Sequence, residues 1–227
     1  MTLVFVHGAG CTPEVFVEQL SDFPDARAIA LPGHGAPGSE TTVDGFTDAV
    51  AGAIDAGGWN DVVLCGHSMG GAIAIELAIR AHPAVRAVVA IGSGSRLRVN
   101  EELLAGLAGD FDATSRRIAA WLFAEPTPQR VEYSTRMMAR VGPAQTLADF
   151  AACNAFDATD RLGSIALPFL AIAGDADVMT PPKYARLLGD RIPGAQVRIL
   201  RGAGHLAMLE RPAEANAALR AFVTTLF

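Results

Sequence analysis

The chain has 227 residues, of which 51% are hydrophobic and 19% charged, and its formal net charge at pH 7 is −6. This composition excludes an intrinsically disordered chain and is sufficient for one large domain built around a buried sheet. The negative charge argues against binding to nucleic acid or to an anionic membrane surface, because both attract cationic proteins.

The cysteines and the N-terminal segment indicate the cellular location of the protein. Cys11, Cys65 and Cys153 are odd in number and form no C-x-x-C pair, which argues against a disulfide framework and favours a reducing, cytoplasmic location. The apolar N-terminus lacks a basic segment and leads directly into His7, so we interpret it as a strand rather than a signal peptide. No apolar run reaches the roughly 18 residues needed to span a membrane.

Apolar runs typical of strands alternate with helical patterns along most of the chain. We predict strands at residues 3–7, 27–31, 61–66, 85–92, 167–173 and 196–200. Helices are predicted at 13–20, 43–57, 69–81, 181–190 and 212–226. The helix at 69–81 is apolar nearly all round, which is typical of a buried helix. This alternation predicts an α/β fold with a doubly wound, mostly parallel sheet of about six strands.

The alternation is interrupted between about residues 96 and 162, where helical patterns occur with little strand signal. Helices are predicted there near 100–110, 114–124, 128–140 and 143–156, separated by prolines. An insertion between two core strands, at one end of a sheet, is a candidate cap over an active site. We therefore predict a core of residues 1–95 and 163–227 with a helical cap of residues 96–162.

The pentapeptide Gly66-His67-Ser68-Met69-Gly70 lies between a predicted strand and the buried helix. A serine on such a sharp turn adopts a strained backbone conformation that presents its side chain above the sheet. The two glycines keep Cβ atoms out of the crowded turn. The pattern therefore predicts that Ser68 is a catalytic nucleophile.

A serine hydroxyl reacts only when a base removes its proton, and the base needs a carboxylate to orient it. His205 follows the predicted strand at 196–200, and Asp175 and Asp177 follow the predicted strand at 167–173. Because the carboxyl ends of parallel strands meet at one edge of a sheet, we expect these residues to lie near Ser68. Position alone leaves both aspartates open as the acid.

These residues belong to a set of motifs through which the chain resembles α/β-hydrolases of the small serine carboxylesterase type, over essentially its whole length. The motifs are Val6-His7-Gly8-Ala9-Gly10, Leu31-Pro32-Gly33-His34-Gly35, the Ser68 pentapeptide, Gly174-Asp175-Ala176-Asp177 with Thr180-Pro181, and Gly204-His205 with Glu210-Arg211-Pro212. The resemblance assigns the acid to Asp177 rather than Asp175. It also implies an oxyanion hole formed by the backbone N–H groups of Met69 and Ala9, with Gly10 a weaker candidate. Most members have two strands before the His-Gly strand, and this chain begins at that strand, so we expect a sheet shortened at that edge.

The resemblance implies a carboxylic ester hydrolase in which Ser68 attacks the ester, His205 is the base, and an acyl-enzyme is then hydrolysed. It implies no metal or organic cofactor and a small-molecule ester as the substrate, in a monomer or homodimer. Carbon–carbon bond hydrolases and lyases, perhydrolases, thioesterases and carrier-protein methyl esterases use the same triad and stay open. A non-catalytic ligand receptor with this fold is a further alternative, and it would show no turnover above a Ser68→Ala control.

Other side chains near the expected site allow a structural and a functional interpretation. His7 and His34 lie in glycine-flanked loops and are expected to shape those loops, and His67 is not expected to be a base. Large side chains of the predicted cap could line a substrate pocket or simply pack the cap onto the core, and we predict the first role for Trp121, Phe123, Met137 and Phe156. The predicted cap is also locally basic, because it contains Arg96, Arg98, Arg116, Arg117, Arg136 and Arg140. These arginines either form a solvated face or attract a carboxylate-bearing substrate.

Overall fold

The computed structural model describes residues 1–226 and contains a single six-stranded sheet within them. The strands are β1 (Thr2–Val6), β2 (Arg27–Ile29), β3 (Val62–His67), β4 (Val85–Ile91), β5 (Phe169–Gly174) and β6 (Gln196–Leu200). The helices are η1 (Pro13–Phe16), α1 (Val17–Asp22), α2 (Val43–Ala56), α3 (Met69–Ile79), α4 (Glu101–Gly109), α5 (Phe111–Trp121), α6 (Pro128–Val141), α7 (Pro143–Ala155), η2 (Thr159–Ser164), α8 (Lys183–Arg191), α9 (Ala207–Glu210) and α10 (Pro212–Thr224).

The sheet has the order β2-β1-β3-β4-β5-β6, and all of these neighbouring strands pair in parallel. After β1 the chain moves to β2 on one side and then crosses to β3 on the other, so β1 and β3 flank a topological switch point. The loops that leave their carboxyl ends diverge there and open a crevice, which is where open α/β sheets bind ligands. The predicted α/β fold with a mostly parallel sheet is confirmed.

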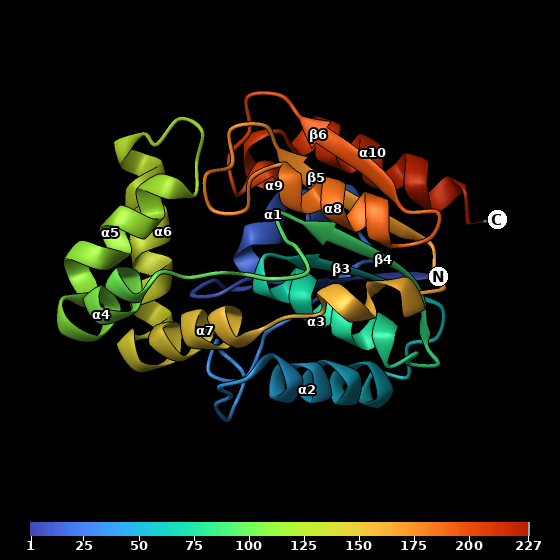
Figure 1. Ribbon diagram of the computed structural model, residues 1–227, viewed down its shortest axis with the longest axis horizontal. Helices are drawn as coiled ribbons and strands as arrows, with labels where there is room; N and C mark the ends of the chain where they lie inside the picture. Colours follow the sequence, from blue (N-terminus) through green and yellow to red (C-terminus); the bar gives the residue numbers. More distant parts are fainter. Residues whose placement is uncertain (227) are drawn as a thin grey trace.

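Helices cover both faces of the sheet (Figure 1). The strands alternate their side chains between two hydrophobic clusters, so that Val4 and Leu64 face α2, α3 and α8 while Phe5 and Cys65 face η1, α9 and α10. The resulting three layers bury β3 and β5 completely, which explains why these central strands are apolar rather than alternating with polar residues.

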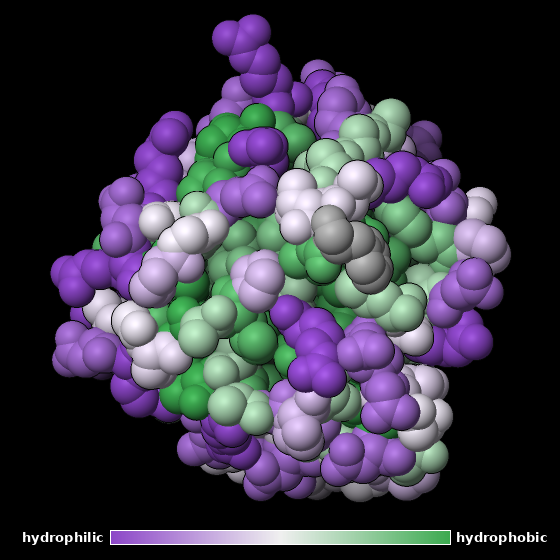
Figure 2. All heavy atoms as spheres, turned by 90° about the vertical axis from the view of Figure 1, so that its right-hand side faces the viewer, coloured by the Kyte–Doolittle hydropathy of each residue, from purple (hydrophilic) through white to green (hydrophobic). Residues whose placement is uncertain are grey.

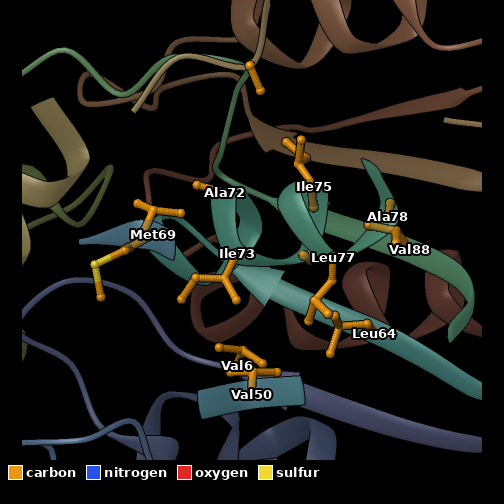
Figure 3. Packing of buried hydrophobic residues seen from close by; sticks show 14 of the residues in the cluster. Val6, Val50, Leu64, Met69, Ala72, Ile73, Ile75, Leu77, Ala78 and Val88 are labelled. Atoms are coloured by element: carbon orange, nitrogen blue, oxygen red, sulfur yellow. The ribbon is translucent and has the colours of Figure 1, made fainter. Parts of the chain in front are cut away.

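Helix α3 lies between the sheet and α2, and every residue from Met69 to Ala78 is buried. Figure 3 shows how Ile73 and Leu77 point from this helix toward Leu64 and Val6 of the sheet and toward Val50 of α2. A helix buried on all sides needs no polar face, which accounts for its sequence being apolar except for Glu76, a buried carboxylate paired with Arg80 and Arg161. This packing fixes the first turn of α3 relative to the strand that precedes it.

Helices α4 to α7 lie together beyond one end of the sheet, on the opposite side from the N-terminus (Figure 1). Asn100, Asp110 and Thr127 each accept a backbone N–H with their side chains and so begin α4, α5 and α6. Helix α7 begins instead with a proline at its first position. The helices agree with the sequence pattern to within a few residues, and the division into a core and a cap of residues 96–162 stays a prediction.

The face opposite these four helices shows apolar atoms at its centre with hydrophilic atoms around them (Figure 2). A surface hollow there is bordered by Met1, Phe169 and Phe222, among other residues. No helix among the described residues has the length and apolar character required to cross a membrane.

Candidate active site

Ser68 occupies a sharp turn between β3 and α3, with backbone angles φ 53° and ψ −115°. Residues other than glycine rarely adopt this left-handed conformation, so the surrounding structure must hold it in place. A Cβ at Gly66 would overlap the Gly70 carbonyl group, and a Cβ at Gly70 would overlap the Val6 carbonyl oxygen. Both glycines of the pentapeptide are therefore required by close backbone contacts.

The turn is further fixed by hydrogen bonds to the backbone of Ser68. Its N–H donates to the Ile91 carbonyl at 2.9 Å, and its carbonyl accepts the Ser93 hydroxyl at 2.8 Å. These bonds connect the turn to the end of β4, the neighbouring strand. The side chain of Ser68 is left facing a cavity that also contacts His205.

His205 and Asp177 are in direct contact beneath this cavity. The His205 Nδ1 lies 2.9 Å from Asp177 Oδ2, and both side chains are almost completely buried. The Thr180 hydroxyl donates to the same carboxylate oxygen at 2.7 Å, and the N–H groups of Met179 and Thr180 donate to Oδ1 at 2.8 and 2.9 Å. Because the carboxylate only accepts, Nδ1 of His205 carries a proton and Nε2 is the nitrogen free to act as a base.

The environment of Asp177 keeps its carboxyl group ionised. Burial by itself opposes the charge, but the nearby His205 and the hydrogen bonds from His205 and Thr180 outweigh it and hold the pKa of Asp177 well below its usual range. Asp175 is exposed and differently occupied, since its Oδ1 accepts the Gly202 N–H at 2.7 Å. The structure therefore brings Asp177 and not Asp175 to His205.

Ser68 and His205 border the same cavity, yet no hydrogen bond joins their side chains within residues 1–226. Contacts of this type are often long in unliganded hydrolases and shorten when substrate binds. The structure thus brings Ser68, Asp177 and His205 to one cavity, and their roles as nucleophile, acid and base stay a prediction.

The loop after β1 brings Ala9 to the wall of the cavity. The Gly8 carbonyl accepts the Cys11 N–H at 3.2 Å and lies 3.0 Å from His7 Nδ1. Because a trans peptide directs its carbonyl and N–H in opposite directions, the Ala9 N–H of the same peptide points away from these donors. It meets no protein acceptor in the described part of the chain.

Met69 supplies the other candidate oxyanion donor. It is the first residue of α3, so its N–H has no acceptor inside the helix. The N-terminus of a helix also carries a partial positive charge that favours an anion. Gly10 is occupied differently, because its N–H donates to Asp149 Oδ2 at 2.8 Å. Ala9 and Met69 thus stay the candidate donors of the oxyanion hole.

The buried histidines His7 and His67 are held as neutral rings. The Leu31 N–H donates to His7 Nε2 at 3.1 Å, so the proton of His7 lies on Nδ1, facing the Gly8 carbonyl. Burial and the neighbouring His34 lower the pKa of His7 to about 3. Burial and His205 also lower the pKa of His67 well below its usual value. Neither ring is suited to take a proton from Ser68, which agrees with the structural roles expected for them.

The cavity is lined mainly by apolar side chains, which come from α5, α6 and α7 and from the segments that follow β4 and β5. Met137 is the one of the four predicted pocket residues that lines it, whereas Trp121 borders a neighbouring surface hollow. Phe123 and Phe156 instead belong to the two hydrophobic clusters of the sheet. The sequence did not single out several other lining residues, which are Leu97, Val99, Ile118, Leu122, Met179 and Tyr184.

Four of the six arginines of the predicted cap are engaged in ion pairs with acidic residues. The pairs are Arg96–Asp157, Arg117–Glu102, Arg136–Glu132 and Arg140–Glu14. Arg98 forms no ion pair within residues 1–226, is exposed, and lines the cavity that contains Ser68. Cys11 also lines the cavity, but burial and the charge of Asp149 raise the pKa of its thiol to about 12, so it is not a reactive thiolate.

Glu210 is a buried carboxylate that hydrogen-bonds to the loop carrying His205. Its Oε2 accepts the Gly204 N–H at 2.6 Å and the Ala124 N–H at 3.0 Å, and its Oε1 lies 2.9 Å from Arg130. It therefore connects the loop that carries His205 to the chain entering α6. The sequence contained this signal as the Glu-Arg-Pro motif after His205, but the contact itself could not be read from spacing.

Comparison with known proteins agrees with this geometry. The sequence model described as "Alpha/beta hydrolase family" matches residues 3–219. The chain belongs to this family. Among curated relatives, a pimeloyl-[acyl-carrier protein] methyl ester esterase of Neisseria meningitidis is 30% identical, with 94% of this chain and 73% of the relative aligned. The corresponding esterase of Stenotrophomonas maltophilia is 29% identical over 99% of this chain and 93% of its own.

Solved structures lead to the same result. A structure described as that of a thermophilic esterase has a TM-score of 0.86 and 30% identity, with 99% of this chain and 90% of that chain covered. Together with the curated relatives, it confirms the prediction that this member of the alpha/beta hydrolase family is an ester hydrolase.

Proposed function

We propose that the protein hydrolyses carboxylic esters through an acyl-enzyme on Ser68. The observation that carries the proposal is that Ser68, in its left-handed turn, shares a cavity with His205, whose Nδ1 is held by the buried Asp177. The Ala9 and Met69 N–H groups, which lack protein acceptors in the described residues, supply the oxyanion hole.

In the acylation step His205 Nε2 accepts the proton of the Ser68 hydroxyl while Oγ bonds to the ester carbonyl carbon. The carbonyl oxygen becomes an oxyanion and is stabilised by the Ala9 and Met69 N–H groups. The tetrahedral intermediate collapses by breaking the bond to the alcohol oxygen, and His205 returns its proton to the departing alcohol. Asp177 stabilises the imidazolium and fixes its tautomer throughout.

In deacylation His205 removes a proton from water, and the water oxygen bonds to the acyl carbon. Collapse of the second tetrahedral intermediate breaks the bond to Ser68 Oγ, which regains its proton from His205. The products are the carboxylic acid and the free enzyme. Each donor of the oxyanion hole contributes about 3–4 kcal/mol to such transition states in other hydrolases.

Hydrolysis of p-nitrophenyl acetate and butyrate tests this proposal. We expect Ser68→Ala to lower kcat by at least about 10³-fold. Ser164→Ala is the matched control, since Ser164 is an exposed serine in η2. A fluorophosphonate probe should modify the wild-type protein at Ser68 only. Wild-type turnover in Ser68→Ala would contradict the nucleophile assignment, and absence of turnover in the wild type would favour the receptor alternative.

A methyl ester on an acyl group attached to a carrier protein is the more specific candidate substrate. Relatives with that named activity support it, as does Arg98, the exposed cation at the cavity. An acidic carrier or its phosphate would be attracted by this charge. We expect the methyl ester of a carrier-bound dicarboxylic acyl chain to react faster than its free counterpart, and Arg98→Gln to reduce that preference. Thioesters and substrates with a cleavable carbon–carbon bond should be assayed alongside these esters, because enzymes for both use the same triad.

The reducing, cytoplasmic location stays a prediction that rests on three unpaired, buried thiols. The monomeric or homodimeric state likewise stays a prediction.

A further inference from the structure

One buried carboxylate of the inserted helices reaches the loop that carries the oxyanion donor. Asp149, on α7, is completely buried, and its Oδ2 accepts the Gly10 N–H at 2.8 Å across 139 residues of sequence. The same oxygen lies 2.7 Å from His34 Nε2, and Oδ1 accepts the Gln145 side-chain amide at 3.0 Å. Every contact of this carboxylate is therefore made inside the protein.

The His34–Asp149 contact is fully buried, and hydrogen bonds fix both of its side chains. His34 Nδ1 lies 2.9 Å from the Pro32 carbonyl, which only accepts, so Nδ1 carries a proton. Its Nε2 contacts Asp149 Oδ2, and the Gly10 N–H and the Gln145 amide donate to the same carboxylate. These hydrogen bonds explain how an acidic group can be fully buried beside the active site.

The pair determines the direction of the peptide between Ala9 and Gly10. The preceding peptide, between Gly8 and Ala9, is held through its carbonyl by His7 and Cys11. Asp149 holds the next peptide through its N–H. Two consecutive peptides are thus fixed, the first by the His7 ring and the Cys11 N–H and the second by Asp149. The Ala9 N–H, which belongs to the first peptide, is left without a protein acceptor in residues 1–226.

We propose that Asp149 is a positioning residue for the oxyanion hole: by binding the Gly10 N–H it keeps that group out of the site and holds the Ala9 N–H toward the reacting oxygen. The inference rests on the proposed function of Ser68 and Ala9. It assigns helix α7 a role in transition-state stabilisation in addition to lining the cavity, so the inserted helices act on the chemistry as well as on substrate choice.

Three variants separate this role from simple packing. Asp149→Ala removes the acceptor. Asp149→Asn retains an oxygen for the Gly10 N–H but loses the charge. Thr146→Val is the matched control, because Thr146 is buried one turn earlier, its Cγ2 faces Gly10, and its hydroxyl has no partner within the described residues. Thr146→Val therefore alters the side chain that packs against Gly10 without removing a hydrogen bond.

With p-nitrophenyl butyrate we expect Asp149→Ala to lower kcat by about 10–100-fold with KM within about threefold, since the oxyanion donor acts in the transition state. Asp149→Asn should recover most of this loss, and Thr146→Val should match the wild type. The affinity for butylboronic acid, whose adduct with Ser68 places an oxygen in the hole, should fall by a factor similar to kcat.

Wild-type kcat in a folded Asp149→Ala protein, or an equal loss in Thr146→Val, would overturn the inference. If Asp149→Ala does not fold, Asp149→Leu tests the missing acceptor at similar volume, and an intact boronic acid affinity in Asp149→Leu would count against the role. Ser68→Ala is measured alongside: if it retains full activity, the proposed function fails, whereas a loss in Ser68→Ala with none in Asp149→Ala refutes only the positioning role.

Discussion

Asp175 accepts the Gly202 N–H at 2.7 Å, so its carboxylate is engaged by the loop leading to His205 rather than by the imidazole itself. Asp177, only two residues later, is buried and contacts His205 Nδ1 at 2.9 Å. The two aspartates follow the same strand, yet one supports a loop from its exposed side and the other faces the base. This difference makes the choice of the acid experimentally accessible.

We expect Asp177→Asn to lower kcat by about 10⁴-fold, because an amide favours the wrong tautomer of His205 and cannot stabilise the imidazolium. Asp175→Asn is the matched variant and should cost less than about tenfold, since its amide oxygen can still accept the Gly202 N–H. Steady-state hydrolysis of p-nitrophenyl butyrate measures both. The opposite ranking would transfer the role of the acid to Asp175.

Glu210 provides a second test of how His205 is held. Its side chain accepts the N–H groups of Gly204 and Ala124 and pairs with Arg130. In Glu210→Gln the new NH2 group must face one of these three donor groups, so one hydrogen bond is lost. We therefore expect a decrease of about 1–3 kcal/mol in the free energy of unfolding. We also expect a lower kcat, because the neighbouring His205 loses part of its support.

Chemical denaturation and steady-state kinetics of Glu210→Gln measure these two effects. Arg130→Gln is a suitable control, since it removes the ion pair but leaves both N–H groups bound to Glu210. If Arg130→Gln reduces kcat as strongly as Glu210→Gln, the backbone contacts are not the important ones.

The sequence predicted the fold closely because its signals are local and repeated. The central strands are apolar runs of a few residues, and α3 is apolar except for Glu76 since both the sheet and α2 cover it. The short helices η2 and α9 were not predicted, because elements of six and four residues are too short to show a repeating apolar pattern. The four inserted helices begin at capping residues or prolines that the sequence displays openly.

The candidate site was predictable where a motif determines a backbone turn and much less so elsewhere. Ser68, Asp177 and His205 each follow a strand, so topology brings them together. The cavity lining was harder, because a large apolar residue in an inserted helix packs equally well against the core, as Phe156 does, or beside the cavity, as Met137 does. The contact between Asp149 and Gly10 joins residues 139 positions apart, and no local pattern encodes it.

His7 should make the fold sensitive to acid. Its pKa of about 3 in the folded protein lies below the value of 6.5 expected in the unfolded chain. As the pH falls from 6.5 toward 3, the unfolded chain binds a proton that the folded protein does not, so stability decreases. Between pH 7 and pH 5 this amounts to about 2 kcal/mol for His7. His67 shifts in the same direction and adds to the loss.

Urea denaturation of wild type and His7→Asn at the two pH values measures this linkage. His7→Asn will be less stable overall, since the Leu31 N–H loses its acceptor, but the difference between its two free energies of unfolding should be smaller than in the wild type. An unchanged difference would show that His7 titrates similarly in the folded and unfolded states.

The glycines of the serine turn differ from a helical glycine in what a methyl group would meet. At Gly70 a Cβ would overlap the Val6 carbonyl oxygen, whereas at the exposed Gly52 of α2 it would meet no atom within 4 Å. We expect Gly70→Ala to destabilise the protein by about 1–3 kcal/mol or more and to reduce kcat, because the backbone at Ser68 must move. Gly52→Ala should stabilise it by about 0.5–1 kcal/mol with kcat unchanged, since alanine loses less conformational entropy in a helix. Thermal denaturation and kinetics of the pair measure both effects, and equal stability of the two variants would be incompatible with the close contact that this structure gives to Gly70.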